Sequence, residues 1–282
     1  MTDYRKINWL ASFPKSGNTW LRCFMDAYYA GKVDINDLLT TVGDDFATRN
    51  GIGVGKLQPQ QYPVDIQMLT RPMALLRLVL QYHDNDVGIP LMVKTHNIHA
   101  VANGIELLPE CLTHRTIYLV RDPRDVFMSY MRHMGGDADQ TIQWFTDDLR
   151  VLCDDRAPKM SDFISSWKKN VLSYANADTH QVKVFRYEDM KAHPVETFCA
   201  ILQWMGETPD PKRVAKALDM VKLSRLKKQE DEKGFLEKTD HQKRFFGGSD
   251  HWSTLPPHII YQIEKHAGSL LKRFGYDKRE AA

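Results

Sequence analysis

The sequence lacks any apolar run approaching the roughly 18 residues that a membrane-spanning helix needs. Its first residues, Met1–Lys6, also lack the basic and then apolar order of a secretory signal peptide. An excess of charge of one sign is also absent, because 38 basic and 36 acidic residues give a formal net charge of only +2. These absences predict a soluble, cytoplasmic protein without a membrane partner. They argue against a nucleic-acid binder, which normally carries a strongly basic face.

Cysteine is rare, and no Cys-x-x-Cys pair occurs among the four residues Cys23, Cys111, Cys153 and Cys199. This spacing predicts reduced, mostly buried thiols rather than a disulfide framework or a zinc site. The chain also lacks internal repeats, low-complexity tracts and a recognisable linker. Its 282 residues are therefore predicted to form one domain, residues 1–282, with a sizeable core.

Short apolar segments alternate with longer amphipathic ones, and this pattern indicates an α/β fold. The predicted strands are Ile7–Phe13, Leu91–Thr95, Thr116–Val120 and Val182–Arg186. The predicted helices span residues 17–29, 71–82, 124–133, 141–153, 162–175, 195–205, 211–221 and 257–274. Residues 44–63 are rich in Gly, Gln and Pro and are predicted to be a loop. The whole arrangement predicts a central parallel sheet that helices cover on both faces.

A tight turn joins the first predicted strand to the first predicted helix, in the run Pro14–Trp20 (PKSGNTW). A helix N-terminus presents unpaired N–H groups and a partial positive charge, so it is a natural anion site. Gly17 lets the backbone approach an anion closely, and Lys15 adds a full charge. Further donors come from the side chains of Ser16, Asn18 and Thr19. The same run also fits an ordinary helix start that Ser16 or Asn18 caps.

The spacing of this turn differs from that of a Walker loop, which reads GxxxxGK[ST]. Here the lysine precedes the glycine by two residues, and no second glycine lies upstream. The stretch Gly51–Lys56 also fails the pattern because Leu57 follows its lysine, and we interpret it as a loop. A P-loop nucleotide kinase or NTPase, which would share the architecture, is one alternative for the function. A non-catalytic nucleotide-binding relative is another.

The octapeptide Phe13–Trp20 (FPKSGNTW) resembles the 5′-phosphosulfate loop of the cytosolic-type sulfotransferases, which use 3′-phosphoadenosine 5′-phosphosulfate (PAPS). The resemblance runs from about Ile7 to Trp252 through further motifs in the expected order. It implies a P-loop-NTPase-like sulfotransferase fold. It also implies that residues 15–19 bind the 5′-phosphate, with Lys15 stabilising charge on the departing phosphate. Trp20 would either flank the adenine or pack in the core.

Lys94-Thr95-His96 ends the second predicted strand and resembles the Lys-x-His catalytic element of this family. An acceptor hydroxyl needs a base to remove its proton, and a histidine titrating near neutrality suits that task. The resemblance implies that His96 is the base and that Lys94 assists on the sulfuryl oxygens. A hydrogen-bonded structural histidine is the alternative. His96 and His99 lack a third ligand, and the transfer needs no metal, so we predict no metal site.

The segment Ile117–Tyr130 (IYLVRDPRDVFMSY) resembles the 3′-phosphate element of the family. Arg121 can offer a bidentate fork to a phosphate. Ser129 lies about one and a half turns into the following helix and can reach the same group. The neighbouring residues are expected to make only capping or surface contacts: Asp122, Pro123, Arg124 and Asp125.

Two later segments resemble the family less completely. Arg186–Met190 (RYEDM) implies that Tyr187 lies near the adenine nucleotide. The family pattern RxGxxGxW corresponds to Lys243–Trp252 (KRFFGGSDHW), in which one glycine is replaced and the arginine lies one residue too far from the tryptophan. Residues implied to contact the nucleotide here are Arg244 and Gly247, with Lys243 as a competitor for Arg244. Leu223 stands where the family often has a stacking Phe, and leucine gives apolar contact without stacking.

The acceptor is expected to be a small molecule with a hydroxyl group. Variable loops line acceptor pockets in this family, here parts of Asp34–Tyr62, Met134–Gln143 and Glu230–Phe246. Their aromatic and Met content favours an apolar or aromatic alcohol or a phenol, and a peptide-antibiotic or carbohydrate hydroxyl is the alternative. Ile260 and Glu264 weakly echo the dimer element of the family, so a homodimer is a further expectation.

Overall fold

The computed structural model describes residues 6–38, 41–42, 64–84, 88–152, 161–179, 181–247 and 251–277. The predicted loop of residues 44–63, with Gly51–Lys56 inside it, lies outside these ranges, as does Cys153. The described cysteines are free thiols, as predicted. The prediction of burial is correct for Cys23 and wrong for Cys111, because Cys111 lies exposed in a 3-10 helix at the surface, Glu110–Leu112.

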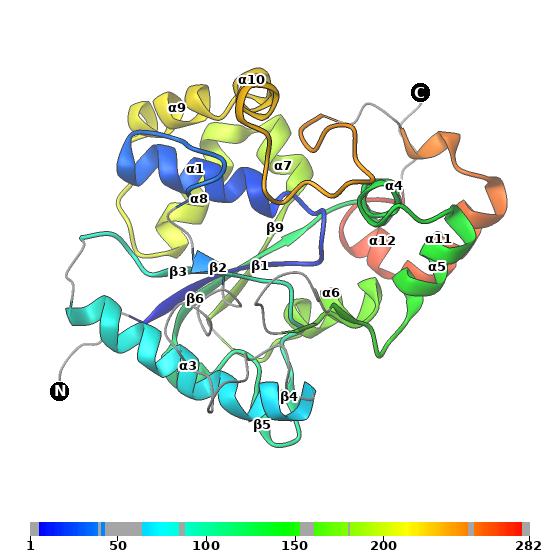
Figure 1. Ribbon diagram of the computed structural model, residues 1–282, viewed down its shortest axis with the longest axis horizontal. Helices are drawn as coiled ribbons and strands as arrows, with labels where there is room; N and C mark the ends of the chain where they lie inside the picture. Colours follow the sequence, from blue (N-terminus) through cyan, green and yellow to red (C-terminus); the bar gives the residue numbers. More distant parts are fainter. Residues whose placement is uncertain are drawn as a thin grey trace.

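A five-stranded sheet forms the centre of the molecule, with the order β2-β3-β1-β6-β9 (Figure 1). Every neighbouring pair in this sheet is parallel. Its strands are β1 (Ile7–Ser12), β2 (Thr41–Val42), β3 (Met92–Thr95), β6 (Thr113–Val120) and β9 (Val182–Arg186). Two small antiparallel pairs stand apart from it: β4 (Val101–Ala102) with β5 (Ile105–Glu106), and β7 (Val151–Leu152) with β8 (Asp162–Phe163). The predicted parallel sheet is therefore confirmed.

The helices cover both faces of the sheet, as the sequence predicts. On one face lie α1 (Asn18–Ala30), α7 (Tyr187–Ala192), α8 (Pro194–Trp204), α9 (Pro211–Met220) and α10 (Leu223–Lys233). On the other lie α3 (Val64–Asp84), α4 (Pro123–Met134), α5 (Ala138–Thr146), α6 (Trp167–Ala175), α11 (Pro257–Ala267) and α12 (Leu270–Arg273). Figure 1 shows α1 and α9 above the sheet and α3 and α6 below it.

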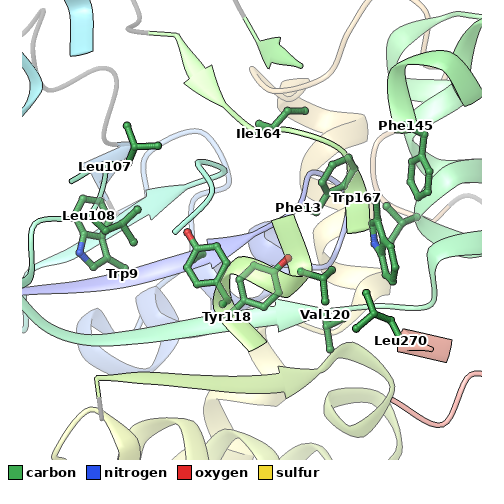
Figure 2. Close-up of a cluster of buried hydrophobic side chains, with 14 of the residues drawn as sticks. Trp9, Phe13, Leu107, Leu108, Tyr118, Val120, Phe145, Ile164, Trp167 and Leu270 are labelled. Atoms are coloured by element: carbon green, nitrogen blue, oxygen red, sulfur yellow. The ribbon is translucent and has the colours of Figure 1, made fainter. Parts of the chain in front are cut away.

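Strand β1 contributes to both hydrophobic cores, because successive side chains of a strand point to opposite faces. Trp9 belongs to the cluster between the sheet and helices α3 and α6, and Figure 2 shows this cluster. Leu10 belongs to the cluster between the sheet and helices α1 and α8. Neighbouring β6 alternates in the same way, with Tyr118 on the first side and Leu119 on the second. All six residues of β1 are buried, as expected for the central strand of a parallel sheet.

Four predicted helices have wrong boundaries. The helix predicted for residues 71–82 is α3, which begins earlier, at Val64, and continues to Asp84 with Pro72 inside it. The helix predicted for residues 141–153 is α5, which ends at Thr146 because the chain then pairs as β7 with β8. The helix predicted for 162–175 begins only at Trp167, since Ser165 has a left-handed φ of 58° and Ser166 caps the Lys169 amide. The helix predicted for 257–274 is divided at Gly268, whose φ is 57°.

No described helix is long and apolar enough to cross a membrane.

Candidate active site

The residues singled out by the sequence meet at one edge of the sheet, where the parallel strands β1, β3, β6 and β9 end. The first loop follows β1, His96 follows β3, Arg121 follows β6 and Tyr187 follows β9. The register brings these ends level, because Ala11 pairs with Thr95 and Val120 with Arg186. Crevices outside the carboxyl ends of parallel strands are where open α/β sheets bind ligands.

The loop between β1 and α1 has an unusual backbone. Lys15 has a φ of 69° and Gly17 a φ of 100°, both in the left-handed region. Gly17 is the N-cap residue of α1 and provides no side-chain cap. The alternative in which Ser16 or Asn18 caps the helix is wrong, because neither side chain bonds the first-turn amides. The first turn of α1 therefore keeps N–H groups available for an anion.

Buried polar atoms underlie this loop. The Asn18 amide group donates to the Leu10 carbonyl over 2.8 Å and to the Ser12 hydroxyl over 3.3 Å, so it fixes the loop to β1. Ser16 is buried, and its Oγ has no hydrogen-bond partner within the described part of the chain. A buried hydroxyl that lacks a partner costs free energy unless a ligand satisfies it. Ser16 thus fits a site that binds an oxygen-rich anion.

Tyr187 packs against the same loop. A Cβ added to Gly17 would lie 2.5 Å from Cδ2 of Tyr187, so any other residue would collide with the ring. The Tyr187 ring also makes an edge contact with Trp20, at 6.0 Å between centroids, and Trp20 packs in turn against Phe198. Trp20 is half-buried, so it both joins the core and borders the loop.

His96 is held with one ring nitrogen committed to the protein. Its Nδ1 donates to the Ser12 carbonyl over 2.7 Å, which leaves Nε2 as the unprotonated nitrogen of the neutral ring. Burial, and next the charge of Lys94, lower the pKa of His96 from 6.5 to about 3. The backbone of His96 is fixed as well, because the Asn170 amide group donates to its carbonyl over 3.0 Å. The ring is therefore neutral and oriented, while its pKa lies well below the near-neutral value that the sequence predicted and that suits a general base best.

Lys15 projects from the strained loop onto an aromatic ring. Its Nζ lies 3.8 Å from the centroid of Phe245, a cation–π contact. Burial is the main cause that lowers the pKa of Lys15 from 10.5 to about 7, and the charges of Lys94 and Arg121 lower it further. Glu237 opposes this shift. A lysine with a pKa of about 7 is only half charged at pH 7, so a bound anion that raises this pKa makes it fully charged.

Glu237 is a member of this cluster that the sequence did not reveal. Its carboxylate forms an ion pair with Arg22, accepts a 3.3 Å hydrogen bond from the Thr19 hydroxyl and lies 3.9 Å from Lys94 Nζ. Burial would raise the pKa of Glu237, but Lys94 and Arg22 outweigh it and hold this pKa well below its usual range. No local sequence motif marks Glu237, because its partner Thr19 lies 218 residues away in the chain.

Arg121 links the first loop to β6. Its Nη1 donates to the Lys15 carbonyl over 3.2 Å, and its guanidinium lies 4.6 Å from the centroid of Tyr187. Asp125 lies 3.7 Å from Nη2. The buried Nε has no partner within the described residues, so the fork retains donor capacity. Ser129 lies half-buried on α4, eight residues after Arg121.

Arg124 differs from its prediction. The sequence predicted a capping or surface contact, but Arg124 is buried and donates to Asp122, to Glu264 and to the Tyr276 carbonyl. Its guanidinium also lies 4.2 Å from the Trp252 centroid. Asp122 accepts from the Arg124 amide and Pro123 begins α4, both as predicted. Arg124 therefore joins α4 to the C-terminal part of the chain and is absent from the site.

Leu223, Arg244 and Gly247, which the resemblance implied as further nucleotide contacts, do not form a cluster like that at the strand ends. Leu223 begins α10 with 51% of its surface exposed. Arg244 is exposed and forms a 2.6 Å ion pair with Asp231. Gly247 has a φ of 87°, and an added Cβ would lie 2.0 Å from Cε of Lys227. Lys227 is thus a basic side chain at this position that the sequence analysis did not single out.

No cluster of three or more His, Cys, Asp or Glu side chains suited to a metal ion occurs among the described residues.

At one edge of the sheet lie an uncapped helix start, two lysines, an arginine fork and a neutral histidine. These features indicate an α/β protein that binds anionic groups and has a base beside them. The comparison with protein families makes the class specific. The model described as "Sulfotransferase domain" matches residues 6–275, and the chain belongs to this family. It is thus a sulfotransferase, as the motifs predicted. A search of curated proteins gave no match.

Solved structures share the fold at low sequence identity. Mouse sulfotransferase SULT7A1 complexed with PAP is 16% identical with a TM-score of 0.58, covering 93% of this chain and 83% of its own. Retinol dehydratase in a complex with retinol and PAP is 17% identical with a TM-score of 0.61, covering 100% and 85%. Retinol dehydratase with androsterone and inactive cofactor PAP is 16% identical, with a TM-score of 0.59, and covers 98% and 82%. The predicted fold class is confirmed.

Proposed function

We propose that this sulfotransferase moves a sulfuryl group from PAPS to the hydroxyl of a small-molecule acceptor, with His96 as the general base. One observation carries the proposal. The Nδ1 of His96 is committed to the Ser12 carbonyl, so Nε2 is free to take a proton beside Lys94 and the uncapped start of α1. A binding protein without catalysis would have no need of an oriented neutral histidine at this position.

The 5′ end of the donor would lie on the first turn of α1. Backbone N–H groups of residues 16–19, with the hydroxyls of Ser16 and Thr19, bind the phosphate in this proposal. Ser16 supports this role because its buried hydroxyl lacks a partner in the described chain. Gly17 and Asn18 shape the loop, and Trp20 with Tyr187 forms the aromatic wall beside it.

The 3′-phosphate would lie beside Arg121 and Ser129, after β6. Arg121 supports this assignment because its guanidinium already bridges the loop and the Tyr187 ring and retains an unpaired Nε among the described residues. Gly247 and Leu223 would contribute close backbone and apolar contact. Arg244 would exchange Asp231 for the phosphate, so its contribution is smaller than that of Arg121.

The reaction is an in-line displacement at sulfur. The acceptor oxygen forms a bond to sulfur while the bond from sulfur to the 5′-phosphate oxygen breaks, and His96 Nε2 takes the acceptor proton. Lys15 stabilises the charge that builds on the departing phosphate, and Lys94 does so on the sulfuryl oxygens. These residues account for every step of the proposed mechanism, which uses no metal ion.

The proposal includes an apolar or aromatic alcohol, or a phenol, as acceptor. Two structural neighbours with a similar fold were solved with retinol and with androsterone, which supports an apolar acceptor. A peptide-antibiotic or carbohydrate hydroxyl is the alternative.

One domain over residues 1–282, a homodimer and a cytoplasmic location stay predictions from the sequence. In the structure Ile260 packs partly against the core and Glu264 binds Arg124.

Transfer of labelled sulfur from PAPS to a panel of phenols and alcohols tests the function, with labelled ATP and Mg²⁺ assayed in parallel. We expect sulfated product from PAPS, unchanged by a chelator, and no phosphorylation from ATP. Phosphoryl transfer or ATP hydrolysis without PAPS turnover would instead support a nucleotide kinase or NTPase. Binding of PAP without turnover of any acceptor would support a non-catalytic relative.

A further inference from the structure

A carboxylate from the C-terminal part of the chain lies inside the cationic part of the site. Glu237 Oε2 accepts from the Thr19 hydroxyl over 3.3 Å and lies 3.9 Å from Lys94 Nζ. Its Oε1 pairs with Arg22, whose side chain is buried on α1. Thr19 and Lys94 are the residues proposed to hold the phosphate and the sulfuryl oxygens. One carboxylate therefore contacts binders of both halves of the phosphosulfate.

The charge of this carboxylate also reaches the proposed catalytic residues. Glu237 raises the pKa of Lys15 and of His96, against the burial that lowers both. Its own carboxyl group stays ionised, because Lys94 and Arg22 hold its pKa well below the usual range. An anion at this position is thus stabilised by the same positive field that an anionic donor would use.

Two anions cannot share these contacts. If a bound donor placed its phosphate against Thr19 and its sulfuryl group against Lys94, the oxygens of both would face the Glu237 carboxylate, and like charges this close repel strongly. One of the two anions has to leave. Because the donor has to be bound during turnover, the anion that leaves is the Glu237 carboxylate.

We propose that Glu237 is an internal substitute for the phosphosulfate of the donor: it occupies a site formed by Thr19, Arg22 and Lys94 and moves out when the donor binds. The inference rests on the proposed function and deepens it. It adds Arg22 as a residue that binds the sulfuryl end of the donor. It also makes Glu237 a competitor that weakens donor affinity in the empty enzyme.

The surrounding segment has anchors that do not depend on this carboxylate. Glu230 accepts from the amides of Phe245 and Phe246, and the Thr239 hydroxyl donates to the His133 carbonyl. The Leu236 amide donates to the Asn36 side chain over 2.8 Å. The side chain of Glu237 can therefore leave the site while the backbone around it stays in place.

Titration of the purified full chain with inorganic sulfate and with PAPS, each followed by calorimetry, tests the inference. Glu237→Gln removes the charge at nearly constant size, and we expect it to tighten both ligands about tenfold. The matched control is Glu232→Gln, an exposed residue on α10 that pairs with Lys228 and should leave both affinities unchanged. Unchanged or weaker binding of sulfate and PAPS to Glu237→Gln would overturn the inference.

A crystal structure of the wild type with inorganic sulfate provides a test that does not require the variant to fold. We expect sulfate between Thr19, Arg22 and Lys94, with the Glu237 carboxylate moved away. Sulfate bound elsewhere while Glu237 keeps its pairing with Arg22 would refute the inference. Failure of the proposed function gives a different result, because the wild type would then bind neither PAP nor PAPS, or would bind them without turning over any acceptor.

Discussion

Two regions of the molecule differ in how their residues reach the site. The first, here called the strand-end region, comprises residues 15–20, 94–96, Arg121 and Tyr187, and each part lies at or shortly after the carboxyl end of a parallel strand. The second, the C-terminal segment, comprises residues 234–247 and is positioned by side-chain contacts such as that of Glu230 with the Phe245 and Phe246 amides. The strand-end residues converge, whereas Arg244 is exposed and paired with Asp231.

The two regions are positioned in different ways, one by the sheet and the other by side-chain contacts. Hydrogen-bond register fixes where a strand ends, so a residue that follows a strand can be placed from the sheet alone. The C-terminal segment lacks regular structure across residues 234–247 and depends on contacts with α4, α10 and the loop after α1. We therefore expect the chemistry and most donor affinity to come from the strand-end region, and smaller or competing effects from the C-terminal segment.

The largest expected effect is at His96. His96→Ala should lower turnover by about a hundredfold to ten-thousandfold, the usual contribution of a general base, while the dissociation constant for PAP stays within about twofold. Steady-state kinetics with calorimetry checks both values. His99→Ala is the control, because His99 lies three residues away without a proposed role. Turnover of His96→Ala at the wild-type rate would eliminate His96 as the base.

Arg121 should give the next largest effect. Arg121→Ala is expected to weaken PAP binding about tenfold to a hundredfold, since a charged hydrogen-bonding fork is lost. Binding of adenosine 5′-monophosphate, which lacks the 3′-phosphate, should change less than about twofold. Parallel titrations of the two nucleotides measure this difference. Equal losses for both would mean that Arg121 acts only by holding the Lys15 carbonyl.

Lys15 should make binding depend on pH. Its pKa is about 7 in the empty protein and must rise when an anion binds, so above pH 7 binding takes up a proton. PAP affinity should then fall up to about tenfold per pH unit above 7, and stay free of this effect below 7 where Lys15 is already charged. Lys15→Arg should abolish the decline, because arginine stays charged. A wild-type affinity that is constant from neutral to alkaline pH would contradict the assignment.

Arg244 should give the smallest effect. Because it is exposed and must exchange its Asp231 partner, Arg244→Ala is expected to weaken PAP binding less than about fivefold. Calorimetry alongside Arg121→Ala measures the ratio of the two losses. A loss at Arg244 as large as that at Arg121 would remove the distinction between the two regions.

Much of the fold could be predicted from the sequence, since all four predicted strands appear and Val182–Arg186 matches in full. Apolar runs of this length and spacing are a strong signal in a parallel sheet. Helix α10 was missed because its sequence is highly polar and only Leu226 and Glu230 are buried, so no apolar periodicity marks it. Strand β2 was missed because it has only two residues, Thr41–Val42.

The convergence of the candidate site residues could be predicted where a motif lies near a strand end, as for Lys15, His96 and Arg121. Glu237 could not, because nothing in its local sequence distinguishes it from the exposed acids of α10 nearby. Only the tertiary fold brings it to Arg22 across 215 residues. Arg124 was misjudged for a related reason, since its partners Glu264 and Tyr276 lie far along the chain.

The most direct test of the account is a calorimetric titration of the wild-type protein with PAP and, separately, with ATP and Mg²⁺. We predict that PAP binds at least about a hundredfold more tightly, because Arg121 and the start of α1 are proposed to hold the 3′- and 5′-phosphates of one nucleotide. ATP with Mg²⁺ binding as tightly as PAP, or more tightly, would contradict it.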